Sequence, residues 1–119
     1  MIDHLGFAVS DLARAKAFYT AALAPLDYAV VMDVGDACGF GAQGKPDFWI
    51  GKGVATPIHV AILAKDRKTV DAFHAAAIRA GGRDNGPPGI RAHYHPNYYG
   101  AFVLDPDGHN IEAVCHSPK

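Results

Sequence analysis

The sequence predicts an α+β fold in which a single domain of 119 residues is built from two tandem βαβββ modules. An internal repeat is the first observation behind this prediction. Moving along the chain by 55 residues brings His59–Asp66 onto His4–Asp11, and each of these octets begins with His and ends with Asp. Helical spacing of apolar residues follows each octet, and short strand-like segments bounded by turn residues complete each half.

The first module is expected at about residues 1–54. Its opening strand is predicted at 4–9, where apolar residues alternate with polar or small ones. Ser10 or Asp11 is a suitable N-cap for a helix that continues to about Leu23. Glycine-rich turns then separate three short strands, predicted at roughly 28–32, 37–41 and 47–51.

The second module is expected at about residues 55–119 and repeats this order. Its opening strand is predicted at 59–64, and Asp66 caps a helix that stops at Gly81. Residues 85–98 contain a Pro-Pro-Gly sequence and several His and Tyr residues, and we interpret them as an irregular functional loop. The remaining strands are predicted near Arg83, at 99–104 and at 110–115, with a hairpin turn at 105–108.

Composition excludes several classes of partner. The chain has 11 Lys and Arg against 12 Asp and Glu, a net charge of −1, so nucleic-acid binding driven by bulk charge is not expected. No apolar run approaches the roughly 18 residues of a membrane span, and no export signal is visible at the N-terminus. Two cysteines without CxxC spacing cannot form a cysteine zinc site. We therefore expect a cytoplasmic protein that contacts neither nucleic acid nor membrane.

Strand parity indicates a candidate metal site. His4 and His59 lie opposite the apolar residues of their strands and so face away from the helices, and Glu112 has the same parity in the last strand. Each residue alone is more simply explained as an ordinary polar strand residue. If the two sheets curl around a common cavity, however, two imidazoles and one carboxylate converge there. Such a set binds Fe(II), Mn(II) or a similar ion and leaves coordination positions open for substrate.

The paired strand-start histidines, the Asp-Pro-Asp-Gly-His-Asn-Ile-Glu run at 105–112 and the duplicated half-domain resemble the vicinal oxygen chelate superfamily. This superfamily includes glyoxalase I, extradiol dioxygenases, fosfomycin-modifying enzymes and bleomycin-resistance proteins. The resemblance covers nearly the whole chain. It implies a curved mixed sheet around a cavity, a homodimer, and a divalent metal ion (Fe, Mn, Zn or Ni) held by His4, His59 and Glu112, either within one chain or across the dimer.

Three departures leave the reaction open between lyase and dioxygenase chemistry. Where glyoxalase I enzymes have a fourth ligand at the end of the first half, this sequence has Trp49 at approximately that place. Where extradiol dioxygenases have a tyrosine ten residues before the ligand Glu, it has Phe102. Where fosfomycin-modifying transferases have a hydroxyl two residues after the first His, it has Gly6.

The loop at 85–98 supplies further candidates. His95 or Tyr98 could transfer a proton, and Arg91 could bind an anionic substrate, although decoration of a surface loop explains these residues equally well. The expected substrate pocket comprises Trp49, Arg91, His93 and Phe102.

These observations predict a divalent-metal-dependent enzyme of the glyoxalase/dioxygenase type. Its substrate would be a small molecule that chelates the metal through adjacent oxygens. The alternative is a metal-free protein that binds a small molecule or drug in an aromatic cavity, as bleomycin-resistance proteins do. The amount of bound metal would distinguish the two.

Overall fold

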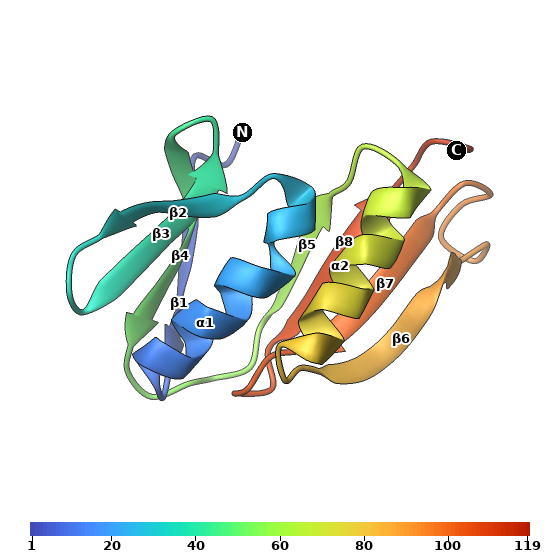
Figure 1. Cartoon of the computed structure of the whole chain (residues 1–119). Helices are drawn as coiled ribbons and strands as arrows, with labels where there is room; N and C mark the ends of the chain where they lie inside the picture. Colours follow the sequence, from blue (N-terminus) through green and yellow to red (C-terminus); the bar gives the residue numbers. More distant parts are fainter.

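The structure, a computed structural model that describes all of residues 1–119, contains two modules, each with one helix packed on a four-stranded mixed sheet (Figure 1). The order of strands and α-helix is the same in both modules, which confirms the predicted βαβββ repeat. No strand of one sheet is hydrogen-bonded to a strand of the other.

In the first module the strand order is β1-β4-β3-β2, and β1 is parallel to β4 while the other pairs are antiparallel. Asp11 caps the helix as predicted, because its Oδ1 accepts a hydrogen bond from the backbone N–H of Arg14 at 3.1 Å. The elements are β1 (Leu5–Val9), α1 (Leu12–Ala22), a 3-10 turn (Ala24–Leu26), β2 (Ala29–Asp33), β3 (Ala37–Ala42) and β4 (Lys45–Lys52).

The second module has the equivalent order β5-β8-β7-β6, with β5 parallel to β8. Asp66 caps its helix and accepts the backbone N–H of Thr69 at 2.7 Å. Two of its strands have the predicted bounds, at 99–104 and 110–115. The elements are β5 (His59–Leu63), α2 (Arg67–Arg79), β6 (Arg83–Ile90), β7 (Tyr99–Leu104) and β8 (Asn110–Cys115).

The prediction that residues 85–98 are irregular was wrong for their first part. β6 continues to Ile90 and includes Pro87 and Pro88, with register shifts on either side of Gly86 where it pairs with β7. Proline is tolerated because β6 is the edge strand of its sheet, so a missing N–H costs no hydrogen bond to a second neighbour.

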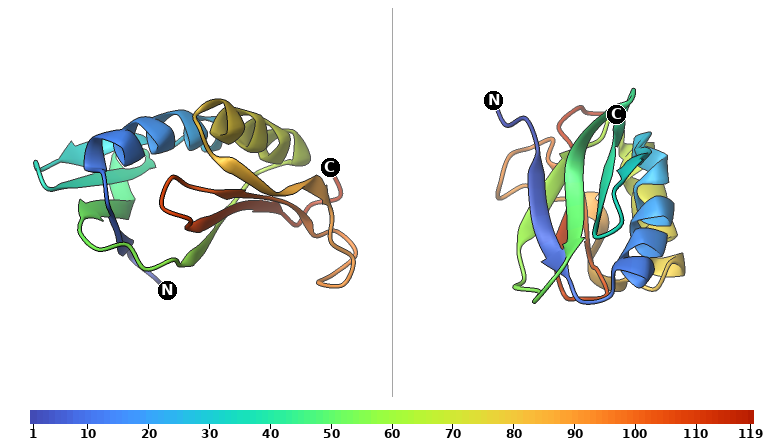
Figure 2. Two further views of the ribbon diagram at one scale, coloured as in Figure 1. Left: turned by 90° about the horizontal axis from the view of Figure 1, so that it is seen from below. Right: turned by 90° about the vertical axis from the view of Figure 1, so that its left-hand side faces the viewer.

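Both helices lie side by side on the same side of the two sheets (Figure 2). One hydrophobic core of 22 buried residues extends beneath them through both modules. The opposite faces of the sheets carry no helix, and we call them the open faces. The side chains of His4, His59 and Glu112 belong to these faces by strand parity. Neither helix is long and apolar enough to cross a membrane.

His109 joins the two modules. Its Nδ1 accepts the backbone N–H of Ile58 at 3.1 Å, so its Nε2 carries the proton and donates to the carbonyl oxygen of Ala8 at 2.9 Å. The imidazole is fully buried, and its centroid lies 4.6 Å from that of the Phe7 ring in an edge-on contact. A second contact supports this junction, because the Tyr19 hydroxyl donates to Asp105 Oδ2 at 2.5 Å.

We predict that His109→Ala lowers the free energy of unfolding by about 3 kcal/mol, because it leaves a cavity and removes the partners of two backbone groups. Urea unfolding monitored by circular dichroism measures this loss. His74→Ala, which removes a peripheral His–Asp84 contact, is the matched control and should cost less than about 1 kcal/mol. An equal loss in both variants would contradict this role for His109.

Candidate functional site

The first half of the site is a carboxylate held on the open face of the second sheet. The side chain of Glu112 is only 1% exposed although no helix covers this face. Its Oε1 lies 2.9 Å from His59 Nε2, and its Oε2 accepts a hydrogen bond from the Tyr98 hydroxyl. His59 itself remains 53% exposed, so the buried carboxylate lies beneath an accessible imidazole.

The sheet register explains this meeting. Ala61 is paired with Glu112, and His59 precedes Ala61 by two residues, so both side chains leave the same face of neighbouring strands. On the other side of Glu112 lies Gly100, where a Cβ atom would be 3.3 Å from Glu112 Oε2 and 3.3 Å from the Tyr98 ring. The missing side chain at Gly100 therefore makes room for this contact.

Tyr98 is a hydrogen-bond donor in this arrangement. The pKa of Tyr98 is raised well above its usual value. Burial is the larger cause, and the hydrogen bond to Glu112 is the second. Its hydroxyl therefore remains protonated at neutral pH. Tyr98 lies just before β7 and positions the Glu112 carboxylate from the side opposite His59.

Arg91 and Phe102 lie next to this group. The Arg91 guanidinium carbon is 5.4 Å from the centroid of the Phe102 ring, and Nη2 donates to the Pro87 carbonyl at 2.7 Å. The Phe102 and His59 rings are 6.2 Å apart. Two predicted pocket residues are thus placed beside the predicted ligands on one sheet.

The other loop residues form a separate stack. His95 accepts the backbone N–H of Asn97 at Nδ1, and its Nε2 lies 2.5 Å from Nδ1 of His116. His93 lies against Tyr94, with ring centroids 4.1 Å apart. The His95 ring is 5.5 Å from the ring of Tyr98, whose hydroxyl is hydrogen-bonded to Glu112. The sequence pattern did not single out His116, whose partner is 21 residues away in the chain.

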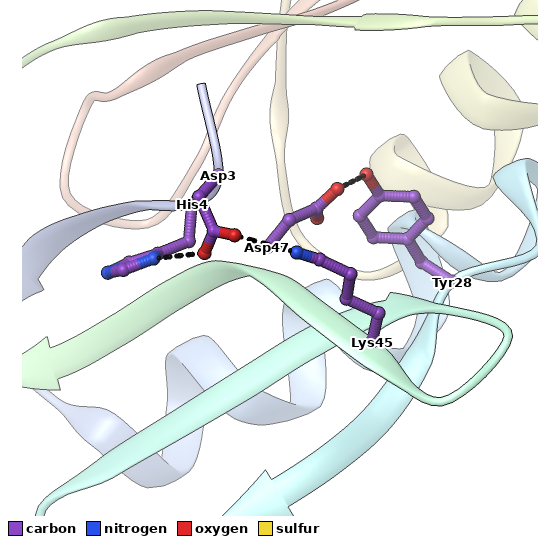
Figure 3. Close-up of polar contacts among 5 residues, drawn as sticks. All are labelled: Asp3, His4, Tyr28, Lys45 and Asp47. Carbon is purple, nitrogen blue, oxygen red and sulfur yellow. Dashed lines mark hydrogen bonds and ion pairs between the residues drawn. The ribbon is translucent and has the colours of Figure 1, made fainter. Parts of the chain in front are cut away.

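The second half of the site lies on the first sheet. His4 comes directly before β1, its side chain is 60% exposed, and its Nδ1 is 2.8 Å from Asp3 Oδ1 (Figure 3). Lys45 Nζ lies 2.9 Å from the other Asp3 oxygen. These hydrogen bonds lower the pKa of Asp3 to about 2, and the one from Lys45 has the larger effect. Asp3, which sequence reasoning missed, thus orients the imidazole and leaves Nε2 of His4 free.

Trp49 occupies the position in the first module that Glu112 occupies in the second. β1 Gly6 is paired with Trp49 just as β5 Ala61 is paired with Glu112. Trp49 and His4 line one hollow of about 580 Å³ on the open face. The register of the two sheets therefore makes Trp49 the counterpart of Glu112.

A single chain does not bring the three predicted metal ligands together. His59 and Glu112 are in contact, whereas His4 projects from the other sheet and is hydrogen-bonded to Asp3. No group of three or more His, Cys, Asp or Glu side chains in the chain is arranged to hold a metal ion. Each sheet instead carries part of the predicted site.

The residues 1–113 match the family model described as the glyoxalase/bleomycin resistance protein/dioxygenase superfamily. The chain belongs to this superfamily. Its paired βαβββ modules and the place of the candidate site on their helix-free faces agree with that membership. No curated protein matches this chain.

Solved structures of other superfamily proteins have the same fold. A glyoxalase/bleomycin resistance protein from Albidiferax ferrireducens T118 is 30% identical, with a TM-score of 0.86 over 95% of this chain and 97% of that one. A glyoxalase-related enzyme from Fulvimarina pelagi is 17% identical, with a TM-score of 0.75 over 97% of this chain and 87% of that one. A lactoylglutathione lyase from Agrobacterium tumefaciens is 17% identical, with a TM-score of 0.73 over 97% of this chain and 92% of that one.

A tyrosine–carboxylate pair lies near His4 (Figure 3). The Tyr28 hydroxyl donates to Asp47 Oδ2 at 2.9 Å, while Asp47 Oδ1 is buried without a partner. The pKa of Tyr28 is raised to about 12, mainly by burial and secondly by the hydrogen bond to Asp47. Both residues line a groove of about 250 Å³ between β1 and β5.

This raised pKa predicts a pH dependence of stability. An unfolded tyrosine loses its proton near pH 10, whereas folded Tyr28 keeps its proton until about pH 12, so stability falls as the pH rises through this window. Between about pH 9 and pH 11, Tyr28→Phe should therefore lose less unfolding free energy than the wild type in urea titrations. The exposed Tyr94→Phe is the control. If the unfolding free energy of Tyr28→Phe falls with pH as steeply as that of the wild type and of the control, the raised pKa of Tyr28 does not contribute to the pH dependence of stability.

Proposed function

We propose that this chain is a divalent-metal-dependent enzyme whose small substrate chelates the metal through adjacent oxygens. His59 and Glu112 of one copy, together with His4 of a second copy, would hold the ion. The observation that carries this proposal is the buried Glu112 carboxylate, 2.9 Å from the His59 imidazole on a face that no helix covers. Lyase and dioxygenase reactions both remain compatible with this donor set.

The donors fit such an ion. Two ligands at right angles, each about 2.1 Å from one ion, are about 3.0 Å apart, close to the observed separation of His59 Nε2 and Glu112 Oε1. His4 has the arrangement expected of a metal-binding histidine, because a carboxylate engages Nδ1 and leaves Nε2 free. Iron, manganese, zinc and nickel are all consistent with two imidazoles and one carboxylate.

A homodimer would complete the site. Within one chain, His4 and the His59–Glu112 pair are on different sheets, and the open faces of both sheets are available for contact. In a twofold dimer, the open face of the first sheet of one copy can oppose that of the second sheet of the other copy, and the symmetry creates this contact twice. A homodimer would therefore contain two equivalent sites.

The residues around the ion would bind the substrate and donate or accept protons. A bound divalent ion supplies Lewis-acid polarisation of the substrate's oxygens. Tyr98 keeps its proton and fixes the Glu112 carboxylate, and Arg91 offers positive charge to an anionic substrate. Neutral His95 accepts at Nδ1 and so carries its proton at Nε2, which faces His116. This imidazole pair could hold or release a proton beside Tyr98.

The alternative function is metal-free binding of a small molecule. The hollow that contains Trp49 favours it, because the residues lining that hollow include only one imidazole and one carboxylate. Metal content distinguishes the two functions.

We predict about one divalent ion per chain in protein purified without chelator, measured by elemental analysis. His4→Ala, His59→Ala and Glu112→Ala should each lose most of this metal, because each removes one of three donors. His74→Ala is the matched control, since His74 also contacts a carboxylate, Asp84, at 2.9 Å but lies away from the site. Metal absent from the wild type, or unchanged in the three site variants, would support the metal-free alternative.

Mixing two variants tests whether two copies share the site. A heterodimer of His4→Ala and His59→Ala chains carries both substitutions in one site and leaves the other intact. Random reassociation of an equal mixture should therefore restore about a quarter of the wild-type metal. If each site lay within one chain, mixing would restore none.

Tyr98→Phe tests the positioning of Glu112. Loss of the hydroxyl leaves one buried carboxylate oxygen without its donor, and substitutions of residues that orient metal ligands commonly lower metal affinity about 10- to 100-fold. Competition with a metallochromic indicator measures this change. Tyr94→Phe is the control, because Tyr94 contacts the Tyr98 ring, whereas the hydrogen bonds of Glu112 go to His59 and Tyr98. Unchanged affinity in Tyr98→Phe would remove Tyr98 from the site.

A further inference from the structure

The two modules present different chemistry at the same position. In the second module, Ala61 of β5 is paired with Glu112, whose carboxylate is buried. In the first module, the equivalent residue is Trp49, on the same open face as His4. A site made from both faces would therefore have an indole ring where an exact repeat would supply another metal-binding side chain.

Glycines flank Trp49 on both neighbouring strands. Its partners across the sheet are Gly6 on one side and Gly39 on the other. The indole lies over Gly39, because a Cβ atom there would be 2.8 Å from the indole Cε2 and Cζ2 atoms. On the other side of Trp49, towards β1, the indole ring leaves the surface of the sheet uncovered, and we call this surface the floor.

That free floor forms a hollow of about 390 Å³, which is within the range of small-molecule sites. Trp49 lines it, and the small residues Gly6, Ala8 and Gly51 keep the floor low. A flat space of this kind beside an indole suits a planar ring, because aromatic groups gain from offset or edge-on contact with each other.

Shape, and not charge, distinguishes this hollow. Lys52 is paired with the buried Val9, so its side chain leaves the helix-covered face of the sheet, where it lines another hollow with Lys16 and Asp33. Lys45, at the other end of β4, is already paired with Asp3. The hollow therefore favours a ligand by its flat floor and its indole ring.

We propose that Trp49 and the floor formed by Gly6, Ala8 and Gly51 bind the planar, conjugated part of the substrate. This inference rests on the proposed function for the position of the substrate beside the metal. The contact with Trp49 belongs to one sheet of one chain, and so it is testable without metal.

The test compares two acids that carry the same oxygen groups on rings of different shape. 2-Hydroxybenzoate is planar, whereas cis-2-hydroxycyclohexanecarboxylate is puckered. Calorimetric titration of the full-length, chelator-treated protein measures both affinities. Because the chain has a single tryptophan, its one indole N–H resonance in NMR spectra reports contact at Trp49. We expect the planar acid to bind about 3- to 10-fold more tightly and to shift this resonance.

Variants separate stacking from charge and from folding. Trp49→Leu should abolish the preference for the planar acid, whereas Trp49→Phe should retain most of it because a ring remains. Lys52→Gln is a control, because the Lys52 side chain leaves the other face of the sheet, so both affinities and the preference should stay unchanged. In Gly6→Ala the added Cβ would lie 3.5 Å from the Trp49 Cβ, an ordinary contact, so this variant should fold and yet weaken the planar acid by raising the floor.

Equal binding of the two acids by the wild type, absence of binding by either, or an undiminished planar preference in Trp49→Leu would overturn the inference. If Trp49→Leu does not fold, loss of preference in Gly6→Ala supports it, and an unchanged preference in Gly6→Ala overturns it. Failure of the proposed function has a different result: the wild type would bind no divalent metal while its metal-free planar preference still depended on Trp49.

Discussion

The candidate site depends on one buried carboxylate. Glu112 has almost no exposed surface on a sheet face without a helix, and an ionised group in that position requires hydrogen-bond partners. His59 and Tyr98 approach its two oxygens from opposite sides. The parallel register of β5 and β8 supplies the first partner, and the absence of a side chain at Gly100 admits the second. The proposed metal site and the position of the Tyr98 donor both depend on this constraint.

Duplication of the βαβββ module provides the frame, and divergence between the copies provides the chemistry. His4 and His59 keep equivalent places at the start of the two opening strands, whereas Trp49 and Glu112 differ at the equivalent place in the closing strands. In the proposed site, the second module would therefore contribute two metal donors, and the first would contribute one donor and an indole. A substrate held between two such faces would meet metal ligands on one side and an aromatic surface on the other.

The local parts of this arrangement could be predicted from the sequence. The repeat, the helix caps Asp11 and Asp66 and the strands at 99–104 and 110–115 are properties of short segments, and strand parity placed His59 and Glu112 on one face. Contacts between distant segments could not be predicted in this way. Periodicity carries no information on how the two sheets are placed relative to each other, and so it could not show that His4 lies apart from the other two ligands, or that His95 meets His116.

The most direct test of the shared metal site is a crystal structure of the protein grown with Mn²⁺ or Zn²⁺, with the ion located by anomalous scattering. We predict one strong peak per chain, about 2.0–2.3 Å from His59 Nε2 and a Glu112 oxygen of one copy and from His4 of the other. A peak bound only by His95 and His116, or no peak beside Glu112 at saturating metal, would contradict the central claim.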